Sequence, residues 1–262
     1  MATVALDLLG GDGAPGVVAD AIARLCGPES SQPGSPDPAD LIVVGPAAVA
    51  RELLVERGVD PDRVRIVDAG RGASMAGNPL SMLRAHDDVT VTVAVGLVNA
   101  GLADAWVSVG HTGAAVAAAV LGLGRLSGMS RPALAVVLPS LAGPVVLVDA
   151  GAAPDATPDV LRQFALAGWA YSRSLGVASP KVGLISIGSE DGKGDRLRKS
   201  THDLLAESLP AVGVDYVGAV EGHDVAIGSQ AQVFVTDGFT GNVLLKGIEG
   251  AVRWAAYRMG EA

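Results

Sequence analysis

Glycines and polar side chains gather at five points of the chain where a β-rich run gives way to a helical pattern. These segments are residues 7–12, 108–113, 149–151, 188–194 and 236–242. Glycine permits a positive φ and lets a ligand approach the backbone closely, as an anion the size of phosphate would require. In an open parallel sheet, ligands bind beyond the carboxyl ends of the strands. The glycines of a single turn of this kind are explained equally well by a tight bend. Five such turns together predict a shared anion-binding site.

Two of these turns invite a nucleotide-binding interpretation that their residues do not support. Residues 11–16 match G-x-G-x-x-G, but Asp12 would place a negative charge beside a pyrophosphate, and Pro15 removes a backbone donor. The next strand also ends without the acid that would hold a ribose. Residues 188–194 lack the residue order of a P-loop. Lys193, between two glycines of this segment, either reaches a phosphate as a point charge or is an exposed turn residue.

Other polar residues of these turns have a structural interpretation beside a functional one. Asp7, Asp149 and Asp237 end strands, where aspartate often caps the next helix. His111 and His223 lie in Gly-rich segments and are interpreted as loop residues, with a general base as the alternative. No serine stands in a G-x-S-x-G elbow, which leaves a serine hydrolase without a visible nucleophile.

Short β-rich runs alternate with longer helical patterns along the chain. The predicted strands are residues 3–7, 41–44, 64–67, 105–109, 133–138, 145–149, 182–187, 214–217 and 233–236. The clearest predicted helices are residues 47–56, 112–123, 158–175, 195–209 and 241–259. This alternation indicates an α/β fold with right-handed βαβ units and a mostly parallel sheet. No shift in composition marks a boundary, so we expect one α/β domain over residues 1–262, with a surface loop at residues 27–38.

The composition limits the partners and the compartment. Half of the residues (49%) are hydrophobic but only 3% are aromatic, which indicates a core of Ala, Val and Leu. A net charge of −9 argues against nucleic-acid binding, which needs an excess of Lys and Arg. Cys26 is the only cysteine, so neither a disulfide nor a zinc site is expected. The start lacks the basic region of a signal peptide and no apolar run is long enough to cross a membrane, so a cytoplasmic protein is expected.

Eight segments are characteristic when they are taken in order along the chain. They read ALDLLGGDGAP (5–15), ADAWVSVGHTGA (103–114), RPALAVVLP (131–139), VDAGA (148–152), QFALAG (163–168), VGLISIGSEDGKG (182–194), VGAVEGHD (217–224) and VTDGFTGNVLLKGIEG (235–250). Together they resemble the phosphate acyltransferase family of bacterial phospholipid synthesis. The Lys193 segment and the last two segments are the most specific.

This resemblance implies a three-layer α/β/α fold similar to phosphotransacetylases and to isocitrate and isopropylmalate dehydrogenases. It implies an enzyme that moves an acyl group from an acyl carrier protein thioester to inorganic phosphate, forming acyl phosphate for phosphatidic acid synthesis. It further implies a homodimer, possible peripheral membrane contact, and neither a metal nor a nucleotide cofactor. The family continues beyond the last motif into further helices, so the chain is expected to be short at its C-terminal end.

The chain departs from the family pattern at several positions. The departures are Gly13 in place of His, His111 and Ala153 in place of Asn, Ala219 in place of Asn and His223 in place of Arg. Residues 84–88 also replace a basic segment. Several of these lost polar groups fall on the same predicted sheet edge. We therefore keep a catalytically degenerate, partner-dependent binding or regulatory relative as the alternative function, and an NAD(P)-dependent oxidoreductase as a third.

Acyl transfer to phosphate requires mainly positioning and oxyanion stabilisation, because phosphate dianion is already a competent nucleophile at neutral pH. We expect three catalytic residues. Lys193 balances the phosphate charge, Asp237 orients Lys193 or moves a proton, and Asn242 donates to the oxyanion. The expected phosphate-binding residues are Gly10, Gly11, Asp12, Ser108, Gly110, Thr112, Gly113, Asp149 and Gly151, with Asp149 holding its own turn.

An acidic carrier protein must meet a local basic patch on this acidic chain. Arg196, Arg198 and Lys199, close to the Lys193 turn, are the expected carrier-docking residues, with a solvated helix face as the alternative. Lysine is otherwise scarce. The chain's lysines are Lys181, Lys193, Lys199 and Lys246.

Overall fold

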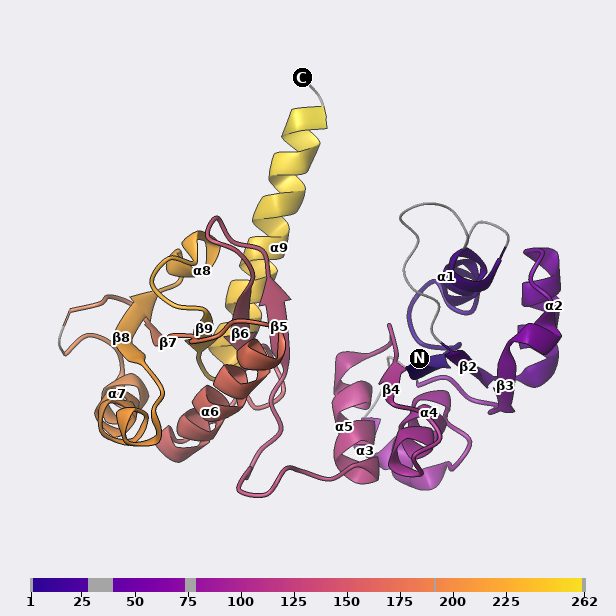
Figure 1. Cartoon of the computed structure of the whole chain (residues 1–262), viewed down its shortest axis with the longest axis horizontal. Helices are drawn as coiled ribbons and strands as arrows, with labels where there is room; N and C mark the ends of the chain where they lie inside the picture. Colours follow the sequence, from indigo (N-terminus) through magenta and orange to yellow (C-terminus); the bar gives the residue numbers. More distant parts are fainter. Residues whose placement is uncertain (1, 28–39, 74–78, 191, 261–262) are drawn as a thin grey trace. The chain divides into compact units, whose positions relative to one another are not determined.

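The computed structural model describes residues 2–27, 40–73, 79–190 and 192–260, and the chain divides into two compact units. The units are Met1–Gly124 and Arg125–Ala262, coloured from indigo to magenta and from pink to yellow in Figure 1. That both units act as the single domain expected over residues 1–262 stays a prediction. No shift in composition marks the junction after Gly124, so the sequence shows no boundary there. The predicted surface loop at residues 27–38 lies outside the described residues after Gly27.

The described part of the first unit holds a four-stranded parallel sheet. Its strands are β1 (Thr3–Asp7), β2 (Asp40–Gly45), β3 (Arg65–Asp68) and β4 (Ala105–Val107), which lie in the order β3-β2-β1-β4. Its helices are α1 (Gly16–Cys26), α2 (Ala47–Glu56), α3 (Pro79–Ala85), α4 (Thr90–Asn99) and α5 (Thr112–Gly122), with a 3₁₀ turn η2 (Pro61–Arg63).

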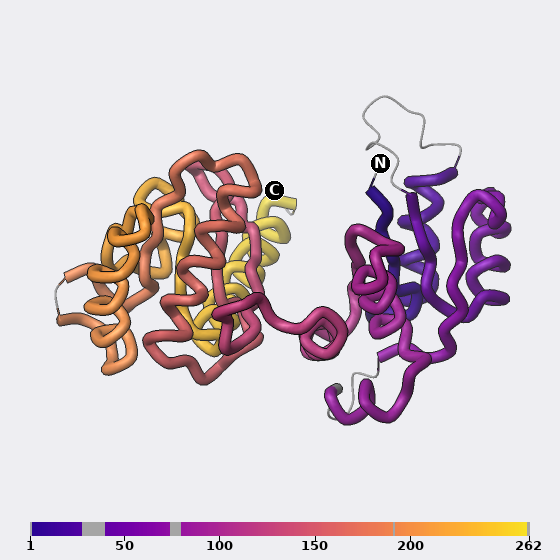
Figure 2. The backbone as a smooth tube through the Cα atoms, turned by 60° about the horizontal axis from the view of Figure 1, so that its bottom comes forward, coloured from indigo at the N-terminus to yellow at the C-terminus, as the bar shows by residue number. Residues whose placement is uncertain are grey.

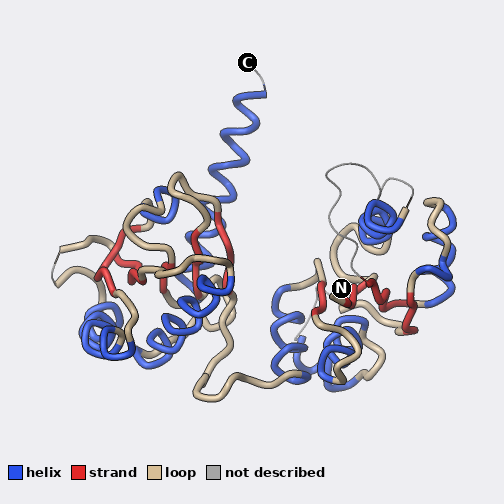
Figure 3. The backbone as a smooth tube through the Cα atoms, in the orientation of Figure 1, coloured by secondary structure: helices blue, strands red, loops and turns tan. Residues whose placement is uncertain are grey.

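Strand β2 shows how this sheet acquires a helical layer on each face. Successive side chains of a strand point to opposite faces. Leu41 and Val43 therefore pack in a cluster with α1 and α2, whereas Ile42 and Val44 pack in a second cluster with Ala94 of α4. In Figure 3 the red strands of this unit lie between blue helices. A strand that is apolar on both faces belongs to a sheet covered on both faces, as parallel sheets usually are.

In the described part of the second unit, five strands form one mixed sheet. They are β5 (Ala135–Leu138), β6 (Val145–Val148), β7 (Val182–Ser186), β8 (Tyr216–Glu221) and β9 (Val233–Val235), in the order β5-β6-β9-β7-β8. All pairs are parallel except β5 with β6. The helices are α6 (Pro158–Ser174), α7 (Arg196–Ser208), α8 (Asp224–Ile227) and α9 (Gly238–Gly260), with a 3₁₀ turn η3 (Pro210–Val212).

The second sheet is also covered on both faces, by α6 and α7 on one side and by α8 and α9 on the other. Phe164 of α6 and Leu205 of α7 are buried in one cluster, and Phe234 of β9 is buried in the other with part of α9. Figure 2 traces this unit from its first strand in pink to α9 in yellow. The α/β class and the mostly parallel sheet expected from the sequence are thus confirmed.

Helix α6 approaches its sheet closely because it carries Gly168. A Cβ atom at this position would lie 2.7 Å from Val233 Cγ1 and 2.8 Å from Val148 Cγ1. Carbon atoms of packed side chains normally lie about 3.5–4.0 Å apart. Any larger residue would push α6 away from β6 and β9.

The last helix, α9, begins in the second core and extends past the sheet (Figure 1). Leu244, Leu245 and Ile248 pack against buried residues, whereas Trp254 and Tyr257 are exposed. None of the described helices is both long and apolar enough to cross a lipid bilayer.

Candidate active site

The five Gly-rich turns lie on two different sheets. The turns after β1 and β4 belong to the first unit, and those after β6, β7 and β9 belong to the second. The expectation of one shared sheet edge is therefore wrong. The sequence shows that each turn follows a strand, but the strand order β5-β6-β9-β7-β8 arises from pairings distant in sequence.

In the first unit, the β1 and β4 turns are joined by a hydrogen bond between two predicted site segments. Ser108 Oγ donates to Asp7 Oδ2 at 2.7 Å, and Leu9 N donates to Asp7 Oδ1 at 3.1 Å. Gly110 N donates in turn to Ser108 Oγ at 3.2 Å. Asp7 is only 2% exposed, and a buried carboxylate requires such partners. Asp7 thus orients the Ser108 hydroxyl.

Glycines allow these two turns to touch. A Cβ atom at Gly10 would lie 2.6 Å from Ser108 Oγ, and one at Gly110 would lie 3.2 Å from Gly10 Cα. Gly11 has a φ of 100°, and its Cβ would lie 2.7 Å from the Val109 carbonyl oxygen. The structure thus brings Gly10, Gly11, Ser108 and Gly110 together. The predicted ligands Asp12, Thr112 and Gly113 are exposed next to this cluster in sequence.

His111 is the N-cap of α5, a role that the sequence analysis did not assign to it. Its Nδ1 accepts a hydrogen bond from the backbone N–H of Ala114 at 3.2 Å. The acceptor nitrogen must be unprotonated, so the imidazole carries its hydrogen on Nε2. Asn, expected at this position from the family pattern, is also a strong N-cap.

In the second unit, Asp149 holds the turn after β6. Its carboxylate accepts hydrogen bonds from the backbone N–H groups of Leu134, Gly151, Ala152 and Ala153, at 2.9, 2.9, 3.0 and 2.6 Å. Asp149 is fully buried. Four donors occupy most of the acceptor sites of one carboxylate. Its turn-holding role is seen directly, whereas direct binding of phosphate by Asp149 stays a prediction.

The start of α9 packs against the Asp149 turn. A Cβ atom at Gly238 would lie 2.6 Å from Asp149 Oδ2, so only glycine fits there. Four residues later, exposed Asn242 lies close to Gly151 of the same turn. A Cβ atom at Gly151 would lie 3.6 Å from both Cβ and Cγ of Asn242. The structure thus brings Asp149, Gly151 and Asn242 together.

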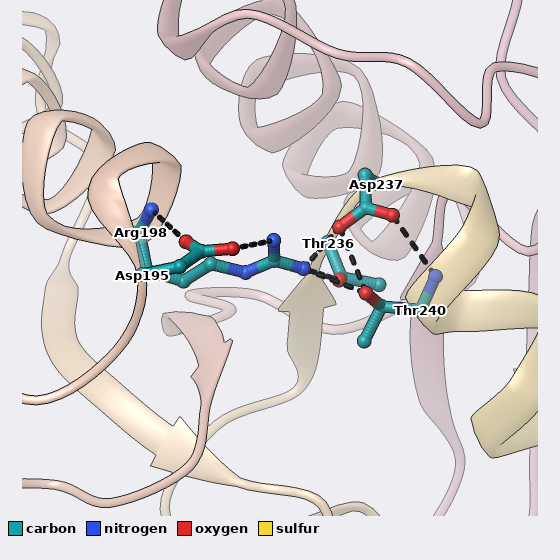
Figure 4. Close-up of polar contacts among 5 residues, drawn as sticks. All are labelled: Asp195, Arg198, Thr236, Asp237 and Thr240. Carbon is teal, nitrogen blue, oxygen red and sulfur yellow. Dashed lines mark hydrogen bonds and ion pairs between the residues drawn. The ribbon is translucent and has the colours of Figure 1, made fainter.

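Arg198 lies at the centre of a polar network between α7 and α9 (Figure 4). Its Nη2 forms an ion pair with Asp237 Oδ2 and donates to Thr240 Oγ1 at 2.8 Å and to Thr236 Oγ1 at 3.2 Å. Its Nη1 donates to Asp195 Oδ2 at 3.1 Å. The Arg198 side chain is only 12% exposed. The expectation that Arg198 belongs to an exposed docking patch is therefore corrected, because its side chain is largely covered and its guanidinium is paired.

Asp237 is buried, and it does not pair with Lys193, the partner expected from the sequence. It pairs with Arg198 instead. Burial acts to raise the pKa of Asp237, but the Thr240 N–H, the Arg198 charge and the Thr240 hydroxyl outweigh it and lower the pKa below its ordinary value. Asp237 is therefore a carboxylate at neutral pH.

A pocket of about 250 Å³ opens between the Lys193 turn, α7 and β8. Lys193 and Lys199 line it, and neither forms an ion pair with any described residue. Ser186 and His202 also line it, with the acids Glu190 and Asp203. The Ser186 hydroxyl is buried and has no hydrogen-bond partner among the described residues. The pocket thus carries two carboxylates and two ammonium groups that have no ion-pair partner in the described part of the chain.

The two remaining candidates from the sequence, His223 and Cys26, lie outside the polar clusters described above. His223 is exposed, 3.6 Å from both Glu221 and Asp224. Cys26 ends α1 against the first core, and burial raises the pKa of its thiol although the Arg63 charge opposes this. Nowhere in the described ranges do three or more His, Cys, Asp or Glu side chains gather as a metal site would require.

Sequence reasoning missed one residue and one pairing that the structure places in the site. Thr240 binds Asp237 through both its N–H, at 2.9 Å, and its hydroxyl, at 2.9 Å. Its spacing of three residues after an aspartate is a capping signal that could have identified it. The pairing of Arg198 with Asp237 spans 39 residues, and no local pattern predicts it.

Solved structures with a similar fold include phosphotransacetylases and a dehydrogenase. A phosphotransacetylase from Streptococcus pyogenes matches with a TM-score of 0.68 and 18% identity, covering 97% of this chain and 82% of that chain. A branched-chain phosphotransacylase from Enterococcus faecalis matches with a TM-score of 0.55 and 18% identity, covering 95% and 84%. A 4-hydroxythreonine-4-phosphate dehydrogenase from Salmonella typhimurium matches at 0.53, with 14% identity and covering 89% and 80%. The chain thus has the α/β fold of the phosphotransacetylases.

Sequence comparison identifies the family to which the chain belongs. The family model described as fatty acid synthesis protein matches residues 2–261. A phosphate acyltransferase from Desulfitobacterium hafniense is 41% identical, covering 95% of this chain and 71% of that protein. One from Thermus thermophilus is 40% identical, covering 95% and 72%. The chain belongs to the phosphate acyltransferase family and is an acyltransferase of fatty acid synthesis.

Proposed function

We propose that the protein transfers the acyl group of an acyl carrier protein thioester to inorganic phosphate, for phosphatidic acid synthesis. The thioester C–S bond breaks, a C–O bond forms between the acyl carbon and a phosphate oxygen, and the carrier leaves as a thiolate that takes up a proton. The observation that carries this proposal is family membership over residues 2–261. Phosphate supplies its own nucleophile, so the protein must supply charge balance and positioning.

Within the second unit, Lys193 balances the phosphate charge and Asn242 donates to the oxyanion. Lys193 is exposed at the pocket without an ion-pair partner among the described residues, which leaves its ammonium group available to an anion. Asn242 lies against Gly151, whose turn is fixed by the four hydrogen bonds to Asp149. A donor beside a fixed turn suits oxyanion stabilisation, where loss of one donor typically costs roughly a hundredfold or more in rate.

Within the first unit, the two touching turns bind phosphate oxygens. The proposed ligands are Gly10, Gly11, Asp12, Ser108, Gly110, Thr112 and Gly113. Free backbone N–H groups at the start of a helix attract anions, and the last two residues begin α5. The hydrogen bond from Ser108 to buried Asp7 fixes the hydroxyl that faces these glycines.

The test is release of carrier thiol from long-chain acyl carrier protein with and without inorganic phosphate, with hydroxylamine added to trap acyl phosphate. We expect phosphate-dependent release and a trapped hydroxamate. Lys193→Ala should raise the Michaelis constant for phosphate roughly tenfold to a hundredfold, because a hydrogen bond to a charged group contributes about 1.5–3 kcal/mol. Lys246→Ala is the matched control, since Lys246 pairs with Glu249 on exposed α9.

Other outcomes separate the competing functions. A folded protein that binds the acyl carrier without releasing thiol would support the degenerate, partner-dependent alternative. Binding of NAD(P) without acyl transfer would support the oxidoreductase. Unchanged phosphate kinetics in Lys193→Ala would remove Lys193 from the phosphate site.

The cellular setting forms part of the proposal. We place the protein in the cytoplasm as a homodimer with peripheral membrane contact, on the family resemblance alone. Light scattering of the purified protein measures its molar mass in solution, and the mass of a monomer would contradict the proposed homodimer. Co-sedimentation with anionic phospholipid vesicles measures membrane contact, and a protein that stays in the supernatant would contradict that.

A further inference from the structure

We infer that Arg198 is a positioning residue that locks the Lys193 turn and the first turn of α9 together, with Asp237 serving as its fixed acceptor and not as a proton carrier. This inference rests on the proposed function, because it assigns a role in that reaction. Arg198 is drawn with its partners in Figure 4.

The stem of Arg198 supports the turn that carries Lys193. Gly194 has a φ of 90°, and a Cβ atom there would lie 2.8 Å from Arg198 Cβ and 3.5 Å from Arg198 Cγ. The turn therefore rests directly on this side chain. The Arg198 backbone N–H is fixed as well, since it donates to the N-cap Asp195 at 2.8 Å.

The guanidinium end of Arg198 holds the start of α9. It bonds to Thr236 and Asp237, which join β9 to α9, and to Thr240 in the first turn of the helix. Asn242 follows two residues after Thr240 and lies against Gly151. A shift of this first turn would therefore displace Asn242 from the Asp149 turn.

Asp237 is fully committed to this network. Its Oδ2 accepts from Arg198 and from the Thr240 hydroxyl, and its Oδ1 accepts from the Thr240 N–H at 2.9 Å. A carboxylate that accepts from a charged donor on one oxygen and from neutral donors on both keeps its negative charge. The lowered pKa of Asp237 agrees with this, and an efficient proton carrier has a pKa close to the working pH.

Only arginine satisfies this arrangement. Arg198 reaches four acceptors with two nitrogens held in one plane. A lysine ammonium is a single point charge and cannot reach Asp195 and the α9 start at once. Arg198→Lys therefore keeps the charge and breaks the connection between the two elements.

The first experiment measures the connection without using activity. Backbone hydrogen–deuterium exchange is compared in wild type, Arg198→Lys and Arg198→Met. We expect faster exchange in both variants at Lys193–Gly194 and at Thr240–Asn242. Arg162→Met is the matched control, because Arg162 forms an exposed pair with Asp159 three residues away on α6. Exchange in Arg198→Lys equal to that of wild type would overturn the inference, even if the protein proves inactive.

The second experiment uses the acyl-transfer assay. A displacement on the order of 1 Å costs up to roughly a hundredfold in rate, so Arg198→Lys should lower kcat by at least about tenfold. Asp237→Asn removes the charged acceptor of Arg198, so its kcat should fall as well, but the pH profile of the remaining activity should keep both of its limbs. Loss of one limb of that profile in Asp237→Asn would identify Asp237 as a proton carrier and overturn the inference. Failure of wild type to transfer acyl groups would contradict the proposed function, while the exchange result would still decide the role of Arg198.

Discussion

At the scale of single residues, three strand-end aspartates are each satisfied by a different set of donors. Asp7 accepts from the Ser108 hydroxyl, Asp149 from four backbone N–H groups, and Asp237 from a guanidinium and a threonine. All three are buried. Burial of a charge is costly unless it is paired or hydrogen-bonded, so each aspartate fixes the turn around it.

The lowered pKa of Asp237 predicts a pH-dependent contribution to stability. A carboxyl group whose pKa is lower in the folded than in the unfolded state stabilises the fold above its unfolded pKa of about 3.9. This contribution is lost as the pH falls through the folded pKa. Asp237→Asn should therefore lower the free energy of unfolding at neutral pH, and the difference from wild type should shrink toward low pH. Urea unfolding at several pH values measures this, and a pH-independent difference would refute it.

The sequence predicted where these aspartates lie but not what they bind. Each position follows from a β-rich run that ends in Asp and leads into a Gly-rich turn. The partners come from distant segments, since Ser108 is 101 residues from Asp7 and Arg198 is 39 residues from Asp237. Arg198 was expected on the surface because its neighbours in sequence are charged. Its contacts depend on how the start of α7 approaches the residues that join β9 to α9, which no local pattern contains.

At the scale of elements, most strands and helices lie close to their predicted positions. Strand β1 and helix α2 have the predicted bounds. Strand β8 was predicted at residues 214–217 but begins at Tyr216. The apolar Val214 misled the prediction, because it is buried in the main cluster of the second unit while lying before the strand. Helix α9 was predicted from residue 241 but begins at Gly238, since its first turn resembles a loop in composition.

The close contact of α6 with its sheet predicts opposite effects for two glycine substitutions. Gly168→Ala should lower the free energy of unfolding by about 1–3 kcal/mol, because the added methyl group collides with Val148 and Val233. Gly247→Ala is the control on α9, where an added Cβ meets nothing within 4 Å. It should raise the free energy of unfolding by up to about 1 kcal/mol through helix propensity. Denaturant unfolding measures both, and a neutral Gly168→Ala would show that α6 can move away from the sheet.

At the scale of the whole molecule, the alternation of strands and helices predicted the fold class but not the division into two sheets. Strand β9 comes last in the chain, yet it pairs with both β6 and β7 in the middle of its sheet. Such pairings are decided by packing across the unit. The clusters of each unit contain only residues of that unit, and the sequence carries no composition shift that would reveal this.

The overall charge of −9 makes recognition of an acidic carrier depend on a local patch. Because Arg198 is largely covered and paired, exposed Arg196 and Lys199 remain the proposed docking residues. Arg196→Glu with Lys199→Glu should raise the Michaelis constant for acyl carrier protein roughly tenfold at low salt and less at high salt. The Michaelis constant for phosphate should change little, and Arg162→Glu on α6 is the control. Carrier kinetics that match wild type would remove this surface from the docking proposal.

The scarcity of lysine has a practical consequence for chemical labelling. Lys181, Lys193, Lys199 and Lys246 all belong to the second unit. A fluorophore or cross-linker that reacts with side-chain amines will therefore modify only that unit. Lys193 and Lys199 line the pocket beside α7. Lys181 and Lys246 serve as internal standards for the labelling reaction. Peptide mass mapping of the labelled chain therefore reports on access to the pocket.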